Sequence, residues 1–233
     1  MAKKIWIDPG HGGTDSGAIH PSGRTEKEDN LKYALELEKQ FRARGLETVL
    51  TRSTDVTMSL AARTALENSE GCALALSCHR NGGVASANGF EVWLHSNAPD
   101  SFVAWGNAIC GRMKELGFKD RGTHKGYVTD PTLNYAVNRD TKSPSMLIEM
   151  GFVSSDVDNA LFDTKLTGLC AAIADECCTF LGSSVVIITP PAEDVVKPAE
   201  PTVETVPKAE YDKLQAKHDA LIADLNTLTE KYK

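Results

Sequence analysis

The most constraining feature of the sequence is a short apolar segment that runs directly into a loop rich in glycine. Residues 3–8 contain the run IWI, which predicts a buried strand. In the loop over residues 8–13, Pro9 removes a ladder donor, and the glycines allow backbone angles that strands do not use. The loop delivers His11 to the carboxyl end of the strand, where open α/β sheets collect functional groups. The sequence therefore predicts a functional imidazole at a sheet edge.

Apolar segments that suit strands alternate with segments of helical spacing as far as residue 181. Strands separated by helices predict an α/β layer with a largely parallel sheet. Residues 118–144 are mixed in character and rich in turn residues, so no regular element is predicted there. The predicted strands cover residues 3–8, 46–52, 72–78, 89–95 and 145–149, and the predicted helices cover residues 27–44, 59–69, 99–116 and 155–181.

Composition narrows the classes of partner. The chain is 41% hydrophobic and 24% charged, which is ordinary for a protein with a real core. Its net charge of −7 makes nucleic acid and anionic membrane surfaces poor partners. No stretch is long enough to insert across a membrane, and the first apolar run is too short for a secretory signal. The six cysteines show no Cys-x-x-Cys spacing and are expected to be reduced, buried thiols.

The composition changes after Gly182, which divides the chain into three predicted parts. Residues 1–182 form the α/β domain, and residues 183–208 hold five of the ten prolines, which predicts an extended linker. Residues 209–233 predict an amphipathic helix with two interleaved heptad series. This helix is either solvated or forms a small coiled coil that makes a homo-oligomer or docks on the domain. The two series are Tyr211, His218, Leu225 and Tyr232, and Leu214, Leu221 and Leu228.

Four residues that can carry chemistry stand at the edges of predicted elements. His11, His79 and Glu149 come at or just after strand ends, and Glu26 precedes the first long helix. Two imidazoles and one carboxylate suit Zn²⁺ and leave a position for water, as in catalytic zinc sites. The spacing alone leaves ordinary alternatives open: core histidines, and a glutamate that complements a helix dipole.

Seven stretches of the sequence together resemble one enzyme family. The chain is similar to the zinc-dependent N-acetylmuramoyl-L-alanine amidases of the amidase-3 family, which cut bacterial peptidoglycan. The resemblance covers nearly all of residues 3–180 and implies a single twisted, mostly parallel sheet flanked by helices. The stretches are IWIDPGHGGTDSGA, GRTEKEDNLKYALEL, TVLTRSTD, LAARTALEN, ALSCHRNG, GFEVWL and NRDTKSPSMLIEMGFVSS.

The resemblance also implies roles for individual residues. Zinc ligands fall on His11, Glu26 and His79, and the catalytic glutamate falls on Glu149. The expected reaction is hydrolysis of the amide between N-acetylmuramic acid and L-alanine, with Glu149 moving the proton to the leaving nitrogen. Two further residues are expected to bind substrate: Arg139, which suits a carboxylate, and Asn81, which suits the stem peptide.

Two other functions stay open at this stage, and so does the route to the cell wall. The same metal set would serve a zinc peptidase that cuts within the stem peptide, and a wall-binding module without activity would keep the fold. Exported members of the family carry signals, whereas this sequence starts at its first predicted strand. The expectation is a protein made in the cytoplasm without a signal peptide that acts on the wall after release, as a phage endolysin does. For Asp8 the expected role is to orient His11 or brace its loop.

Overall fold

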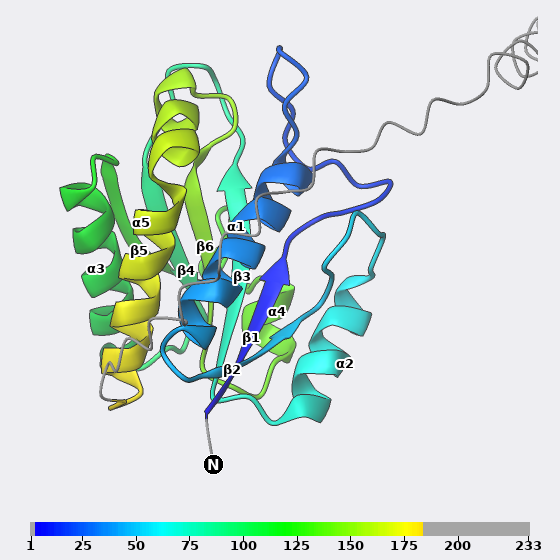
Figure 1. Cartoon of the computed structure of the whole chain (residues 1–233), viewed down its shortest axis with the longest axis vertical. Helices are drawn as coiled ribbons and strands as arrows, with labels where there is room; N and C mark the ends of the chain where they lie inside the picture. Colours follow the sequence, from blue (N-terminus) through cyan, green and yellow to red (C-terminus); the bar gives the residue numbers. More distant parts are fainter. Residues whose placement is uncertain (1–2, 184–233) are drawn as a thin grey trace, which may run out of the picture. The chain divides into compact units, whose positions relative to one another are not determined.

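The computed structural model describes residues 3–183 (Figure 1). Apart from Ser183, the predicted linker and the predicted C-terminal helix lie outside the described residues. No helix in residues 3–183 has the length and apolar character needed to cross a membrane. The strands are β1 (Lys4–Pro9), β2 (Glu47–Leu50), β3 (Leu74–Asn81), β4 (Phe90–Leu94), β5 (Asp120–Lys125) and β6 (Ser145–Phe152). The helices are α1 (Glu26–Arg42), α2 (Leu60–Glu70), α3 (Asp100–Glu115), α4 (Ala136–Asp140) and α5 (Asp156–Phe180).

The strands form one six-stranded sheet in the order β2-β1-β3-β6-β4-β5. Neighbouring strands are parallel except for β4 and β6, which pair antiparallel. The sheet is therefore mostly parallel, as the sequence predicts. Its first four strands in spatial order end at the same edge, which brings the segments that follow β1 and β3 together.

The two faces of the sheet are covered unequally. Alternate strand residues such as Ile5, Leu76 and Ile148 build the larger core, which packs against α1, α3 and α5. Figure 1 shows these three helices together on one side of the sheet, with α4 on the other. The second face carries a smaller cluster around Trp6 and Trp93. Because α4 has five residues and α2 eleven, this face is covered in part, and part of it lines a pocket.

The prediction missed two elements and ended two strands early. Residues 118–144 contain the edge strand β5 and the short helix α4, neither of which was predicted. β5 is largely exposed and lacks apolar alternation, so its pairing with β4 and not its sequence pattern makes it a strand. β3 continues to Asn81 and β6 to Phe152, which places His79 and Glu149 inside their strands.

Candidate metal and catalytic centre

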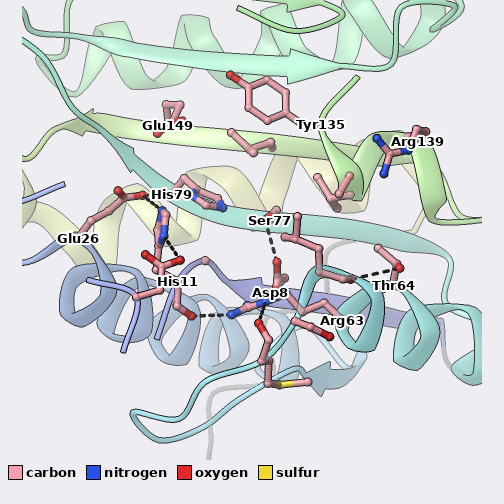
Figure 2. Close-up of a pocket in the computed structure, with 18 of the residues that line it drawn as sticks. Asp8, His11, Glu26, Arg63, Thr64, Ser77, His79, Tyr135, Arg139 and Glu149 are labelled. Atoms are coloured by element: carbon pink, nitrogen blue, oxygen red, sulfur yellow. Dashed lines mark hydrogen bonds and ion pairs between the residues drawn. The ribbon is translucent and has the colours of Figure 1, made fainter. Parts of the chain in front are cut away.

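Two imidazoles and one carboxylate converge beside the sheet edge (Figure 2). His11 lies in the loop after β1, Glu26 is the first residue of α1, and His79 lies in β3. Glu26 Oε1 is 3.2 Å from His11 Nε2 and 3.0 Å from His79 Nδ1. The three ligand atoms all lie within 4.8 Å of one another. Residues from three separate parts of the sequence thus present a compact set of donors.

Glycines make room for this convergence. A Cβ atom on Gly10 would lie 2.2 Å from His79 Cε1, in steric overlap with the ring. A Cβ on Gly17 would lie 2.5 Å from Glu26 Oε2, and Gly17 also has a φ of +62°. Neither position accepts a larger side chain without displacing one of the converging groups. The glycine-rich loop therefore forms the walls around the donors.

Hydrogen bonds fix the charge state of the cluster. Glu26 is 5% exposed, and its Oε1 also accepts from the Arg80 backbone N–H. Burial would raise the pKa of Glu26, but the hydrogen bonds with His11 and His79 outweigh it and hold the pKa well below its usual range. Burial lowers the pKa of His11, and hydrogen bonds to Glu26 and Asp15 reverse this and raise it to about 9. The carboxylate is therefore the anionic centre of the group.

His11 is held from its ring and from its backbone. Its Nδ1 contacts Asp15 Oδ2 at 2.8 Å, which leaves Nε2 directed at Glu26. Its backbone has a φ of +60°, the left-handed region that non-glycine residues rarely adopt. The buried guanidinium of Arg63 donates to the carbonyls of His11 and Pro9 and is neutralised by Asp8. This network holds the loop in the conformation that presents the imidazole.

Glu149 lies beside the cluster because of strand register. It is the direct partner of His79 in the parallel β3–β6 pair and of Glu91 in the antiparallel β4–β6 pair. Paired residues point to the same face of a sheet, so the three side chains form a row. Glu149 is 9% exposed, and its Oε2 has no hydrogen-bond partner among the described residues. Burial raises its pKa well above the usual range, and the charges of Glu26 and Glu91 raise it further.

These groups open into one pocket of about 720 Å³. Its inner end contains the cluster and Glu149, and its outer end reaches Tyr127 and Arg139. The start of α2 and the segment between β5 and α4 supply parts of its lining. A pocket of this size accommodates a small organic ligand or part of a polymer.

The structure gives the remaining predicted residues definite partners. Asn81 lines the pocket, but its Nδ2 donates to Glu91 Oε1 at 2.8 Å. Arg139 lines the outer end, with its Nε and Nη2 each 2.7 Å from an oxygen of Asp140. Asp8 does not contact the His11 ring, which is instead bonded to Asp15; Asp8 braces the loop through Arg63.

Sequence reasoning missed three residues of the site. Asp15 lies four residues after His11 in the same loop, a spacing that could have signalled a partner for the ring. Arg63 is a buried charge on a helix; it lies in the LAARTALEN stretch of the resemblance, but no role was predicted for it. Tyr135 precedes α4, a helix that was not predicted, so its place in the pocket had no signal.

The donor set fits a zinc ion. Zinc bonds to nitrogen and oxygen are about 2.0–2.2 Å long, which places tetrahedral ligands about 3.3 Å apart. The two contacts of Glu26 Oε1 with the imidazoles, 3.2 and 3.0 Å long, are close to that spacing. Three protein ligands from imidazole and carboxylate are also the number found in catalytic zinc sites.

Proteins with similar sequences and folds are named as cell-wall amidases. The family model for N-acetylmuramoyl-L-alanine amidase, amidase-3, matches residues 5–175. The N-acetylmuramoyl-L-alanine amidase CwlM of Bacillus licheniformis is 35% identical over 158 residues, which cover 66% of this chain and 58% of CwlM. The chain spans little more than half the length of the first curated relatives it matches.

Solved structures of N-acetylmuramoyl-L-alanine amidases share the fold of this chain. The catalytic domain of CwlV, an N-acetylmuramoyl-L-alanine amidase of Bacillus (Paenibacillus) polymyxa var. colistinus, superposes with a TM-score of 0.68 at 32% identity. That match covers 78% of this chain and 99% of the CwlV domain. An N-acetylmuramoyl-L-alanine amidase from Clostridium difficile 630 gives a TM-score of 0.71 at 27% identity, covering 78% and 98%.

Proposed function

Because this chain belongs to the N-acetylmuramoyl-L-alanine amidase family, we propose that it hydrolyses the amide between N-acetylmuramic acid and L-alanine in bacterial peptidoglycan. One observation supports this proposal above the others. The imidazoles of His11 and His79 and the carboxylate of Glu26 converge in the same pocket as the buried Glu149. One carboxyl oxygen of Glu149, Oε2, has no hydrogen-bond partner among the described residues. Hydrolysis of an inert amide needs such a combination of charge stabilisation and proton transfer.

In this proposal His11, Glu26 and His79 hold a zinc ion. When bound, such an ion supplies Lewis acidity, which polarises a carbonyl group and makes water a better nucleophile. Asp15 keeps the His11 ring in the orientation that directs Nε2 inward, and Arg80 donates a backbone N–H to Glu26. These contacts hold the ligand side chains in place before zinc binds, so binding costs less conformational entropy.

Glu149 is proposed as the group that moves the proton. As water attacks the lactyl carbonyl, Glu149 accepts a proton from it and then donates that proton to the departing nitrogen of L-alanine. The carbon–nitrogen bond breaks, and a carboxylic acid and an amine are released. Burial and the charges of Glu26 and Glu91 raise the pKa of Glu149, which favours the return of the proton to the leaving nitrogen.

The decisive experiment is digestion of purified peptidoglycan with the full chain. The expected products are new L-alanine amino termini and free muramoyl lactyl groups, and a chelator should abolish their release. Glu149→Gln should keep bound zinc but release no product, since an amide cannot carry the proton. Near-wild-type release by Glu149→Gln would remove Glu149 from the mechanism.

The same digestion separates the two alternatives. Stem fragments with new internal termini would identify a zinc peptidase. Wall binding without any release, in the presence of zinc, would identify a binding module.

The substrate contacts of Arg139 and Asn81, and the release of the protein to the cell wall during lysis, stay predictions. Arg139 is 58% exposed on its side chain, and an ion pair so exposed to solvent is weak, so a substrate carboxylate can compete with Asp140. Asn81 would have to exchange its bond with Glu91 for one to the stem peptide. Release of the protein during lysis is tested by expressing it in bacteria with and without a pore-forming partner and measuring lysis.

A further inference from the structure

We propose that the outer half of the pocket is a sugar-binding subsite, in which Tyr135 and Tyr127 stack on the N-acetylated hexosamine ring that carries the scissile amide. This inference rests on the proposed function and adds to it the glycan side of the substrate. The carbonyl that is attacked is joined to the sugar ring through a short ether link. Any productive complex must therefore place a sugar ring close to the cluster and Glu149.

The outer half of the pocket has an aromatic wall. Tyr135 and Tyr127 both line the pocket, with their ring centroids 4.5 Å apart. Behind them, Trp93 makes an edge contact with Tyr135 at 5.6 Å and stacks on His124 at 4.6 Å. Figure 2 shows Tyr135 along the same side of the pocket as Glu149. The C–H groups on a sugar face are weakly positive and suit the negative face of an aromatic ring.

This wall is held rigidly by bonds that do not involve the cluster. Asn134 accepts the Ser96 backbone N–H at 2.6 Å, which fixes the segment just before Tyr135. Asn138 Nδ2 donates to the Trp93 carbonyl at 2.9 Å and ties α4 to β4. Two backbone hydrogen bonds join Tyr127 and Asp130 in a tight turn. Because the rings are already ordered, stacking a ligand on them costs little conformational entropy.

The charges around the outer half favour a neutral occupant. Asp8 and Arg63 neutralise each other at the pocket floor, and Arg139 is paired with Asp140 at the rim. The opposite wall, at the start of α2, presents Ser59 and Leu60, and Leu60 is 65% exposed. An N-acetylhexosamine is uncharged and has apolar faces and hydroxyl edges, which match these walls. The stem peptide carries several charges, and Arg139 at the rim is the one residue of this outer half that is proposed here to bind one of them.

The pocket also continues outward, as a glycan requires. A second hollow of about 270 Å³ shares Tyr127, Asn134 and Arg139 with the main pocket. Leu133, which is 55% exposed, lines it as well. The shared residues place one hollow beside the other, so a second sugar of the strand can follow the first past Tyr127.

The test is equilibrium binding by the full chain in the presence of chelator, so that no turnover occurs. The probes are the disaccharide of N-acetylglucosamine and N-acetylmuramic acid without peptide, its lactyl carboxyl group blocked as an uncharged methyl amide, and the free stem tripeptide, each titrated by NMR. Tyr135→Ala and Tyr127→Ala are each expected to weaken binding of the disaccharide by about 3- to 10-fold, the loss expected for one stacking contact. Tyr135→Phe should retain wild-type affinity, because the ring face and not the hydroxyl makes the contact.

Val128→Ala is the matched control, since Val128 is 61% exposed next to Tyr127 and is not among the residues that line the pocket. Unchanged disaccharide binding in both tyrosine-to-alanine variants, or no binding to the wild-type chain, overturns the subsite. Weaker binding of the tripeptide in place of the disaccharide assigns the wall to the stem and also overturns it. Because the readout is binding, a wild-type chain that hydrolyses the amide but binds no disaccharide refutes this inference alone, and one that binds the disaccharide but does not hydrolyse the amide refutes the proposed function alone.

Discussion

Asp15 provides the sharpest test of how the cluster is ordered. Its carboxylate contacts His11 Nδ1 at 2.8 Å, so it fixes both the tautomer and the orientation of the ring whose Nε2 faces Glu26. Removal of such a partner typically costs 10–100-fold in metal affinity. The side chain of Asp15 is 62% exposed, which weakens a charge-assisted bond and places the expected loss at the lower end. Asp15→Ala should therefore weaken zinc binding about 10-fold, or about 1.4 kcal/mol.

The assay is competition for zinc between the full chain and a chromophoric chelator at fixed pH. Asp15→Asn can still accept a hydrogen bond from the ring, so its loss should be smaller than that of Asp15→Ala. Asp100→Asn, which removes one exposed charge at the start of α3, controls for net charge and should change little. Zinc affinity of Asp15→Ala within about 2-fold of wild type would refute the view that this hydrogen bond orients a ligand.

Three further outcomes follow from the same geometry. In the metal-free protein the pKa of His11 is about 9 against 6.5 ordinarily, so its contribution to stability is complete below about pH 6.5 and is lost as pH rises through about 9. Urea unfolding measured across this pH range should show the fall in the free energy of unfolding for the wild type but not for His11→Gln. The same dependence of stability on pH in both proteins would contradict this role of His11. Gly10→Ala should abolish zinc binding, because its Cβ would lie 2.2 Å from His79 Cε1 and displace the ring. As the control, Gly168→Ala in α5 has open space around the new Cβ and should raise the free energy of unfolding by about 0.5–1 kcal/mol in thermal unfolding. Arg63→Met should cost about 3–5 kcal/mol by leaving Asp8 buried and unpaired, and adding Asp8→Asn should recover part of that loss; a stability change under 1 kcal/mol in Arg63→Met would show that the pair is dispensable.

The sheet and its main helices were predictable because buried segments leave a pattern. The CALALSC run and the leucine spacing of residues 27–44 correspond to β3 and α1, within a few residues at their ends. β5 and α4 left no such pattern: one is an exposed edge strand and the other is a single short turn of helix. The reversed direction of β4 and β5 also has no local signal, since direction depends on how the chain crosses between strands.

The residues of the site could be predicted from the sequence, but the contacts that support them could not. His11 and His79 stand out as polar residues at the ends of apolar segments, Glu26 is expected as a ligand from the family resemblance, and the structure brings the three together. Asp15 and Arg63 act through hydrogen bonds to a ring and to carbonyl groups, which the sequence does not record. The sequence predicts a strand end at Glu149, but β6 continues to Phe152 across a register shift in its pairing with β3, and Gly151 in that stretch has a φ of +70°.

Strand register places Glu149 beside the imidazole of His79. His79, Glu149 and Glu91 are direct partners across β3, β6 and β4, so a slip of β6 by one residue would exchange Glu149 for Ile148 or Met150 on the pocket face. The same slip would bury the carboxyl group of Glu149 in the larger core beneath α1 and α5, where Ile148 and Met150 now pack. Burying an unpaired carboxyl group there costs several kcal/mol, so the apolar residues of β6 fix the register that the chemistry requires. The geometry of Glu149 relative to His79 is therefore enforced by core packing, which would keep the proposed catalytic arrangement precise on a face that is partly open to solvent.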